Sequence, residues 1–319
     1  LHAAVAHLLR QAHGAGDISL PFPDDPEQDC GLIVLGLGKL GAGELNYSSD
    51  IDLILLFERD KVRYTGRKTA QECFVRMARN LVKLLQDATA EGYVFRTDLR
   101  LRPDPASTPL VISTLAAETY YEGMGQNWER AAMIKARVVA GDQLAGEMFL
   151  KNLRPFIWRK HLDFAAIQDI HSIKRQIYAV KGHRQVAVAG HNIKLGRGGI
   201  REIEFFAQTQ QLIWGGRVMD LRKRATCDAI PALVRLGKCE PGVAEELITA
   251  YRYLRQIEHR LQMIDDQQTQ TLPDYGPALD RVAIFAGHRD TADFETTLRY
   301  HLGRVEDHYA ELFEEAPTL

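Results

Sequence analysis

The sequence has no long hydrophobic run, no clustered cysteines and no excess of charge of either sign. Its longest apolar runs are about five residues, against the roughly 20 that a membrane-spanning helix needs. Lysine and arginine total 40 against 42 aspartates and glutamates, so no basic field indicates a nucleic-acid partner. These absences exclude a membrane-spanning protein and disfavour a protein that binds nucleic acid.

Cysteine and histidine are sparse and scattered. The cysteines lack C-x-x-C spacing, which predicts reduced thiols and a cytoplasmic location; they are Cys30, Cys73, Cys227 and Cys239. No spacing typical of a metal site links the histidines, among them His171, His183, His191 and His259. The start of the chain lacks a signal peptide and an initiator methionine, which predicts a piece of a longer polypeptide.

The length of 319 residues and the hydrophobic content of 45% are typical of a soluble chain with about two domains. Residues 1–28 read as the tail of a helix and a proline-containing linker. Residues 29–117 read as a mixed sheet with helices, and residues 118–319 as a helical bundle. The expected class is therefore α+β, with the sheet domain first and an all-helical domain after it.

The hydrophobic pattern places individual elements. Apolar runs or alternation predict strands over 32–35, 50–57, 93–102 and 111–113, and helical spacing predicts a helix over 73–88. From residue 116 onward the pattern is helical, with its clearest apolar stripe over 244–264.

The most informative stretch runs from Gly36 to Phe57. It passes from an apolar strand through Gly36-Leu-Gly-Lys-Leu-Gly-Ala-Gly43 to Asp50 and Asp52, which open a second strand. Side chains at i and i+2 of a strand share a face, so these two carboxylates project together. Such proximity is costly without a divalent cation, and Mg²⁺ prefers oxygen ligands. The stretch predicts a metal-dependent nucleotidyl-transfer site.

The same glycines allow a second interpretation. Gly36, Gly38 and Gly41 fit the G-x-G-x-x-G pattern of a dinucleotide-binding fold, with Glu58 about 20 residues further on. That fold needs a crossover helix, and residues 46–50 are poor helix formers. It also gives no reason for two aspartates at the start of a buried strand, so it is the weaker alternative.

The third expected strand carries charge on one face. Arg96, Asp98, Arg100 and Arg102 alternate with apolar residues. On an isolated strand this pattern is typical of a solvated face. Beside Asp50 it instead predicts a third metal-binding carboxylate, with Arg100 and Arg102 neutralising phosphate oxygens.

Two further groups are candidates for binding phosphate or nucleotide. Ser48 and Ser49, with the backbone of Gly36 and Gly38, are placed to cradle phosphate oxygens. A second glycine loop over 192–205 leads into a helix, which is typical of an anion site, although helix capping with surface salt bridges is an equal alternative. Its candidate residues are Lys194, Arg197, Glu202 and Glu204. The segment 128–137 is expected to be an ordinary amphipathic helix.

Five separated motifs resemble the bifunctional glutamine synthetase adenylyltransferase/adenylyl-removing enzyme family. They occur in family order and cover the chain from about residue 29 to 275; they lie at 36–53, 95–103, 128–137, 192–205 and 268–273. The pairing of Asn-Tyr-Ser-Ser-Asp-Ile-Asp with Gly-Gly-Ile-Arg-Glu-Ile-Glu-Phe resembles the amino-terminal, adenylyl-removing half.

The resemblance implies a nucleotidyltransferase-like fold to which the 192–205 motif contributes part of the site. It implies phosphorolysis of adenylylated glutamine synthetase to give ADP, with Mg²⁺ held by Asp50, Asp52 and Asp98. It also implies that phosphate enters against Ser48, Ser49, Lys39 and the glycine loop. The implied partners are glutamine synthetase, the PII signal protein and the adenylyltransferase half of the same polypeptide. ATP-dependent adenylylation of the same target and a regulatory module without turnover are the alternatives.

Overall fold

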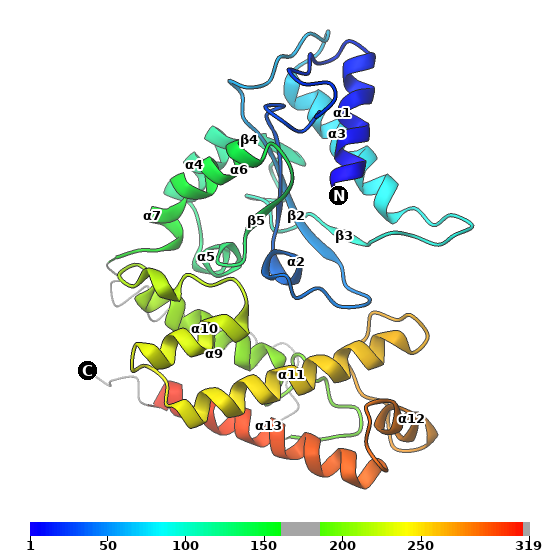
Figure 1. Ribbon diagram of the computed structural model, residues 1–319, viewed down its shortest axis with the longest axis vertical. Coiled ribbons are helices and arrows are strands. Elements are labelled where there is room, and N and C mark those ends of the chain that lie inside the picture. The colour runs from blue at the N-terminus through cyan, green and yellow to red at the C-terminus, as the bar shows by residue number, and fades with distance from the viewer. Residues whose placement is uncertain (161–185, 315–319) are drawn as a thin grey trace. The chain divides into compact units, whose positions relative to one another are not determined.

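The computed structural model describes residues 1–160 and 186–314, which form two compact units. The first consists of Leu1–Leu45 and Ser49–Arg159, and the second of Asn46–Ser48 together with the chain from Lys160 onward. The first holds a mixed sheet with helices and the second holds helices (Figure 1). The predicted α+β class and the order of its two parts are confirmed. The predicted division after residue 117 falls within the first unit.

A five-stranded sheet forms the centre of the first unit. Its order is β3-β2-β1-β5, with β4 also pairing with β2. The strands are β1 (Leu32–Gly36), β2 (Ile51–Phe57), β3 (Thr97–Asp98), β4 (Val111–Ser113) and β5 (Arg137–Gly141). Because β1 and β2 are antiparallel, they cannot form the parallel unit of a dinucleotide-binding fold. The dinucleotide interpretation of the glycines is therefore wrong.

Helices cover both faces of this sheet (Figure 1). α1 and α3 pack against the face that carries Leu32 and Val34, whereas α6 contacts the opposite face at Ile33 and Val138. The apolar spacing of α3 explains its burial, and Thr69 with Glu72 forms a capping box at its start. The helices are α1 (His2–Gly14), α2 (Gly38–Ala42), α3 (Ala70–Gln86), α4 (Thr114–Gly123), α5 (Asn127–Met133), α6 (Gln143–Asn152) and α7 (Arg154–Ile157).

Two expectations about the first unit are wrong. The strand predicted over 93–102 is only Thr97–Asp98, because the N–H groups of Val94 and Phe95 instead donate to the Leu85 carbonyl at the end of α3. The chain is also not helical throughout from residue 116, since β5 follows α5 and pairs with β1. Val138 and Val139 were the available signal, because β-branched pairs favour strands.

The second unit is helical over its described residues. Its helices are α9 (Ile200–Trp214), α10 (Thr226–Arg235), α11 (Pro241–Met263), α12 (Pro277–Phe285) and α13 (Thr291–Glu314), with a short 3₁₀ turn, η1 (Met219–Leu221). The predicted stripe over 244–264 is confirmed, because Leu247, Leu254 and Leu261 of α11 lie in the core of this unit. That core also contains Phe294 and Leu298 of α13.

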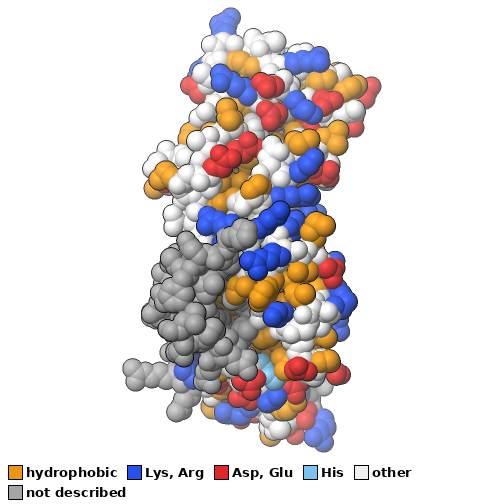
Figure 2. Space-filling view, turned by 90° about the vertical axis from the view of Figure 1, so that its left-hand side faces the viewer, with side chains coloured by type: hydrophobic (Ala, Val, Ile, Leu, Met, Phe, Trp, Pro, Cys, Tyr) orange, Lys and Arg blue, Asp and Glu red, His pale blue; other side chains and the backbone are white. Residues whose placement is uncertain are grey.

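The surface and the thiols are ordinary for such a fold. Basic, acidic and hydrophobic side chains are interspersed on the face that Figure 2 shows. Within residues 1–160 and 186–314, no helix combines the length and the hydrophobicity that crossing a membrane requires. All four cysteines are free thiols, with Cys30 and Cys73 buried.

Candidate functional site

Three carboxylates meet at one edge of the sheet. Asp52 lies on β2 directly opposite Asp98 on β3, because the two strands pair in parallel at this register. Asp50 stands one residue before β2, and Asp50 and Asp98 line the same cleft. The structure therefore brings together the three acids that sequence spacing predicted.

Arginines donate hydrogen bonds to two of these acids. The Arg96 Nε atom donates to Asp50 Oδ1 at 3.0 Å. Arg100 donates to Asp98 through Nε at 3.0 Å to both carboxylate oxygens and through Nη2 at 2.5 Å. Hydrogen bonds from the Arg100 side chain and from its backbone N–H lower the pKa of Asp98 below its usual range.

All three acids act on the charge of Arg100. The Asp98 carboxylate, with Asp50 and Asp52 acting at longer range, raises the pKa of Arg100 above its usual value. The Arg100 side chain is 84% exposed, so its ion pair with Asp98 is open to water. Arg102, by contrast, donates to the carbonyls of Leu99 and Pro105 and so braces the loop that follows β3.

The glycine run forms a turn and one short helix rather than an open loop. Gly38 adopts a φ of +51°, and a Cβ there would lie 2.3 Å from Asp52 Oδ2. The Leu37 N–H donates to the Asp52 carbonyl at 2.9 Å. Glycine at position 38 therefore leaves the space that the Asp52 carboxylate occupies.

The amphipathic helix predicted over 128–137 is shorter than expected, and residues that follow it hold α2 in place. Only Asn127–Met133 is helical, and Arg137 on β5 donates two hydrogen bonds to the Leu40 carbonyl, at 3.0 and 3.2 Å. Gly41 packs so closely that a Cβ would lie 2.1 Å from the Lys135 carbonyl. Arg137 is a supporting residue that sequence reasoning missed.

The two serines belong to different units. Ser48 is buried in the second unit, where its N–H donates to Gln262 Oε1 on α11 at 3.2 Å. Ser49 belongs to the first unit and is partly exposed. The phosphate contacts of Ser48, Ser49 and Lys39 stay predictions. Gln262 carried no sequence signal, because its partner is 214 residues away.

The second glycine motif is held mainly by its own contacts. Glu202 accepts the Gly198 N–H at 3.0 Å, and Asn192 Oδ1 accepts the N–H of Lys194 at 3.0 Å. Arg197 forms an ion pair with Glu306 of α13 at 2.5 Å. These contacts match the capping and salt-bridge alternative.

Arg201 pairs with Glu204 at 3.4 Å on the same helix. The segment 268–273 is bonded to this motif, since the Ile193 N–H donates to the Gln270 carbonyl and the Leu272 N–H to that of His191. A nucleotide contact from Lys194, Arg197, Glu202 or Glu204, and a contribution of this motif to the site, stay predictions.

A cleft of about 500 Å³ opens beside the carboxylates. Its apolar lining comes from Val82 of α3 and from Leu99 and Leu110. Asp50 and Asp98 line it too. Its polar part also includes Arg79 and Gln86, on the same helix as Val82, and Thr97 and Arg100. Spacings of three and four residues on α3 could have indicated this shared face.

The donor atoms suit magnesium by type. Carboxylate oxygens are its preferred protein ligands, and the missing Cβ of Gly38 gives the Asp52 oxygen its place. As the side chains stand in the described residues, no three His, Cys, Asp or Glu groups form a ready metal site. Arg100 must therefore leave Asp98 before that carboxylate can hold a cation.

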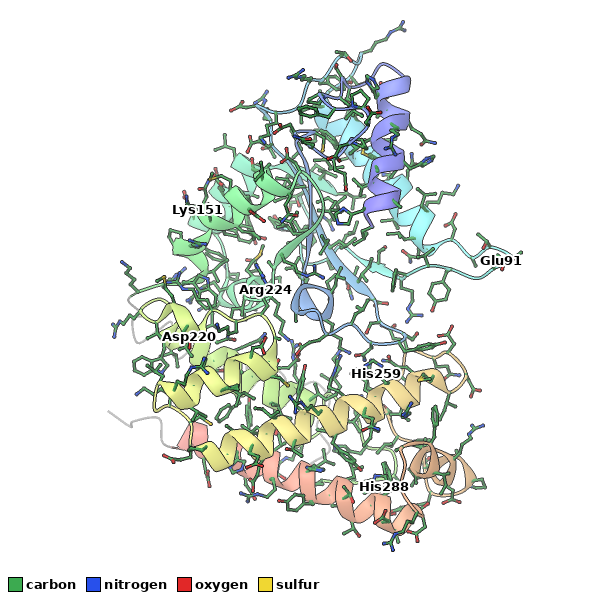
Figure 3. All side chains as sticks on the ribbon, viewed as in Figure 1. Glu91, Lys151, Asp220, Arg224, His259 and His288 are labelled. Atoms are coloured by element: carbon green, nitrogen blue, oxygen red, sulfur yellow. The ribbon has the colours of Figure 1, made fainter. Side chains whose placement is uncertain are left out.

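His259 and His288 lie in different segments of the second unit. His259 lies on α11, whereas His288 lies between α12 and α13 (Figure 3). His191 is buried beside the second glycine motif. His171 and His183 lie outside the described residues.

Comparisons with known proteins give two family matches. Residues 1–152 match the family model described as glutamate-ammonia ligase adenylyltransferase. Residues 171–313 match the model described as GlnD PII-uridylyltransferase. The two models together extend over both units.

Curated relatives match over the whole chain. The bifunctional glutamine synthetase adenylyltransferase/adenylyl-removing enzyme of Rhizobium meliloti is 57% identical over 317 residues, 99% of this chain and 32% of the relative. The protein of the same name from Agrobacterium fabrum is 57% identical over 319 residues, 100% of this chain and 32% of the relative. That from Brucella melitensis biotype 1 is 55% identical over 317 residues, again 99% and 32%. The chain spans about a third of the length of these relatives.

Proposed function

The chain belongs to the family of bifunctional glutamine synthetase adenylyltransferase/adenylyl-removing enzymes, and we propose that it removes AMP from the adenylylated tyrosine of glutamine synthetase by phosphorolysis. The observation that carries the proposal is the meeting of Asp50, Asp52 and Asp98 at the edge of β2 and β3, beside a cleft. Such a carboxylate cluster suits phosphoryl chemistry, which depends on positioning and charge stabilisation.

The proposed reaction needs inorganic phosphate as the only reactant besides the adenylylated tyrosine. An oxygen of inorganic phosphate forms a bond to the phosphorus of the adenylyl group, and the bond from that phosphorus to the tyrosyl oxygen breaks. The tyrosinate takes a proton from water, and the products are ADP and unmodified tyrosine. Because phosphate is already an anion at pH 7, the attack needs no strong general base.

Magnesium is the proposed cofactor, and Asp50, Asp52 and Asp98 are the residues that would hold it. When bound, it would neutralise charge on the phosphoryl oxygens and on the leaving tyrosinate. Arg100 would then be released from Asp98 and become available to the incoming phosphate, which a guanidinium binds well.

The names of the relatives support glutamine synthetase as a partner. We propose adenylylated glutamine synthetase as substrate, PII as the regulatory partner and the adenylyltransferase half as a further part of the same polypeptide. A cytoplasmic location follows from such a substrate.

The direct test supplies adenylylated glutamine synthetase with Mg²⁺ and phosphate, without ATP, and measures ADP release. Phosphate-dependent ADP is the expected result. If no ADP appears but unmodified glutamine synthetase is adenylylated when ATP is added, the proposed direction is wrong and the chain is an ATP-dependent adenylyltransferase. Failure of both reactions would refute both activities for this chain.

A further inference from the structure

We propose that the cleft between α3 and β3 is the subsite for the tyrosyl ring of the protein substrate. This inference rests on the proposed function, because it takes Asp50 and Asp98 to lie at the reacting phosphorus. It goes further by assigning one reactant to a cleft that neither the sequence motifs nor the family matches identify.

The position of the cleft suits a ring that is separated from the phosphorus by a single oxygen atom. Asp50 and Asp98 form part of its wall, so the carboxylate cluster and the cleft are continuous. In the adenylylated substrate the tyrosyl oxygen bonds to phosphorus, and the aromatic ring starts at the next atom. The adenine base is separated from the same phosphorus by a whole ribose.

The aliphatic part of the lining suits a ring whose edge carries no hydrogen-bonding group. Val82, Leu99 and Leu110 present aliphatic surface, which suits a phenyl ring. Adenine recognition needs hydrogen-bond partners for its amine and ring nitrogens. Most of the polar lining is charged and suits the phosphoryl group rather than a base, namely Asp50, Asp98, Arg79 and Arg100. The side-chain amide of Gln86 already accepts the Thr97 hydroxyl through Oε1 at 2.8 Å. The volume of about 500 Å³ also leaves room for the backbone that carries the tyrosine.

The loop beside the cleft is suited to contact with a folded protein. It joins α3 to β3 and extends outward at Glu91 (Figure 3). Val94 and Phe95 on this loop are 60% and 36% exposed. Exposed apolar side chains next to a pocket are typical of protein-contact surfaces.

The test compares two ligands that share the adenylyl group, of which only one carries the tyrosyl ring. Calorimetry measures the affinity of the whole chain for N-acetyl-O-adenylyl-tyrosine amide and for ADP, each with Mg²⁺. Val82→Gln puts an amide into the cleft at a helix-compatible position. We expect it to weaken the tyrosyl probe at least fivefold and ADP less than twofold.

Two variants control for indirect effects. Leu84→Gln makes the same change at an exposed leucine of α3 outside the cleft lining and should leave both affinities unchanged. Val82→Leu keeps the aliphatic lining and should retain binding of the tyrosyl probe.

Several results would overturn the assignment. Equal weakening of ADP would place the nucleotide in the cleft, and unchanged affinity for both ligands would leave the cleft outside the substrate site. Wild-type protein that binds ADP but not the tyrosyl probe would also contradict it. These readouts need no turnover, so a failure of ADP release in the activity assay refutes phosphorolysis separately from the subsite.

Discussion

At the scale of single residues, the candidate site consists of acids that form ion pairs with arginines. Asp98 is ionised because Arg100 donates to it from both its side chain and its backbone. Asp50 has a comparable partner in Arg96. The lowered pKa of Asp98 keeps that carboxylate anionic, which is the form that a divalent cation binds.

Asp52→Asn tests the centre of the cluster. We expect the variant to fold normally and to lose phosphorolysis by several orders of magnitude, because an amide cannot supply the anionic oxygen that a divalent cation prefers. ADP release and circular dichroism measure the two outcomes. Asp60→Asn, at an exposed turn, is the matched control and should keep full activity. Activity retained by the Asp52 variant would contradict the metal assignment.

Arg100→Gln tests whether arginine competes with the cation. Removing this cation from beside Asp98 should tighten Mg²⁺ binding about fivefold, because a neighbouring positive charge repels the metal ion. Calorimetric Mg²⁺ titration gives the affinity directly. Asp98→Ala should change it in the opposite direction, and an unchanged titration in both variants would remove Asp98 from the ligand set.

At the scale of elements, short contacts between backbone and side chain shape the site. α2 begins at Gly38 against Asp52 and ends where Arg137 binds the Leu40 carbonyl. The element is only five residues long, so these tertiary contacts rather than helix propensity hold it.

Gly38→Ala and Gly43→Ala separate backbone strain from displacement of a carboxylate. Both glycines have positive φ, +51° and +74°, so alanine at either should cost about 1 kcal/mol of unfolding free energy. Only a Cβ at Gly38 meets Asp52, so only Gly38→Ala should also weaken Mg²⁺ binding strongly. Denaturant unfolding and calorimetry measure the two effects, and equal Mg²⁺ affinities in both variants would contradict the account.

Glu129→Gln tests a buried carboxylate that caps α5. Its Oε2 accepts the Gln126 N–H at 2.8 Å, and burial raises the pKa of Glu129 above its usual value. The folded state therefore binds this proton more tightly than the unfolded state does. Wild-type stability falls as pH rises from the ordinary glutamate range, about 4.3, through the raised pKa.

A glutamine at position 129 does not titrate, so the variant should gain stability relative to wild type as pH rises through that window. Thermal midpoints from pH 4.5 to 8 measure the difference. Glu122→Gln, at an exposed position of α4, should show no such trend. A constant difference between the Glu129 variant and wild type would mean that burial does not shift this group.

At the scale of the whole molecule, residues 1–160 and 186–314 contain two hydrophobic cores without a shared residue. One lies between α1, α3 and the sheet, and the other lies among the helices of the second unit. Each core is large enough to give its unit a stability of its own.

Leu254→Ala should therefore act on the second unit alone. Truncating this fully buried leucine should cost about 2–5 kcal/mol by leaving a cavity. Hydrogen exchange should accelerate for amides within 186–314 and stay unchanged in β1 and β2. Leu53→Ala in the sheet is the matched control and should show the reverse. Acceleration across both units in either variant would show that they unfold together.

The sequence alone predicted what depends on local spacing. A continuous apolar run placed β2, which is buried at nearly every position. Period-3.6 patterns placed α3 and α11, because a buried face imposes its repeat directly on the chain. The i, i+2 spacing of Asp50 and Asp52 identified the acidic edge for the same reason. The segments on either side of β3 misled the prediction. The Leu85 carbonyl holds Val94 and Phe95 before β3, and Arg102 braces the loop after it, so neither segment extends the strand.

Only the tertiary structure decided how distant segments meet. It paired Asp52 with Asp98, made β1 and β2 antiparallel, and brought Arg137 to the end of α2. It also formed the cleft lined by Val82 and Leu110. Pairing register and side-chain contacts between residues tens of positions apart depend on how the elements pack, and no local repeat of the sequence records that packing.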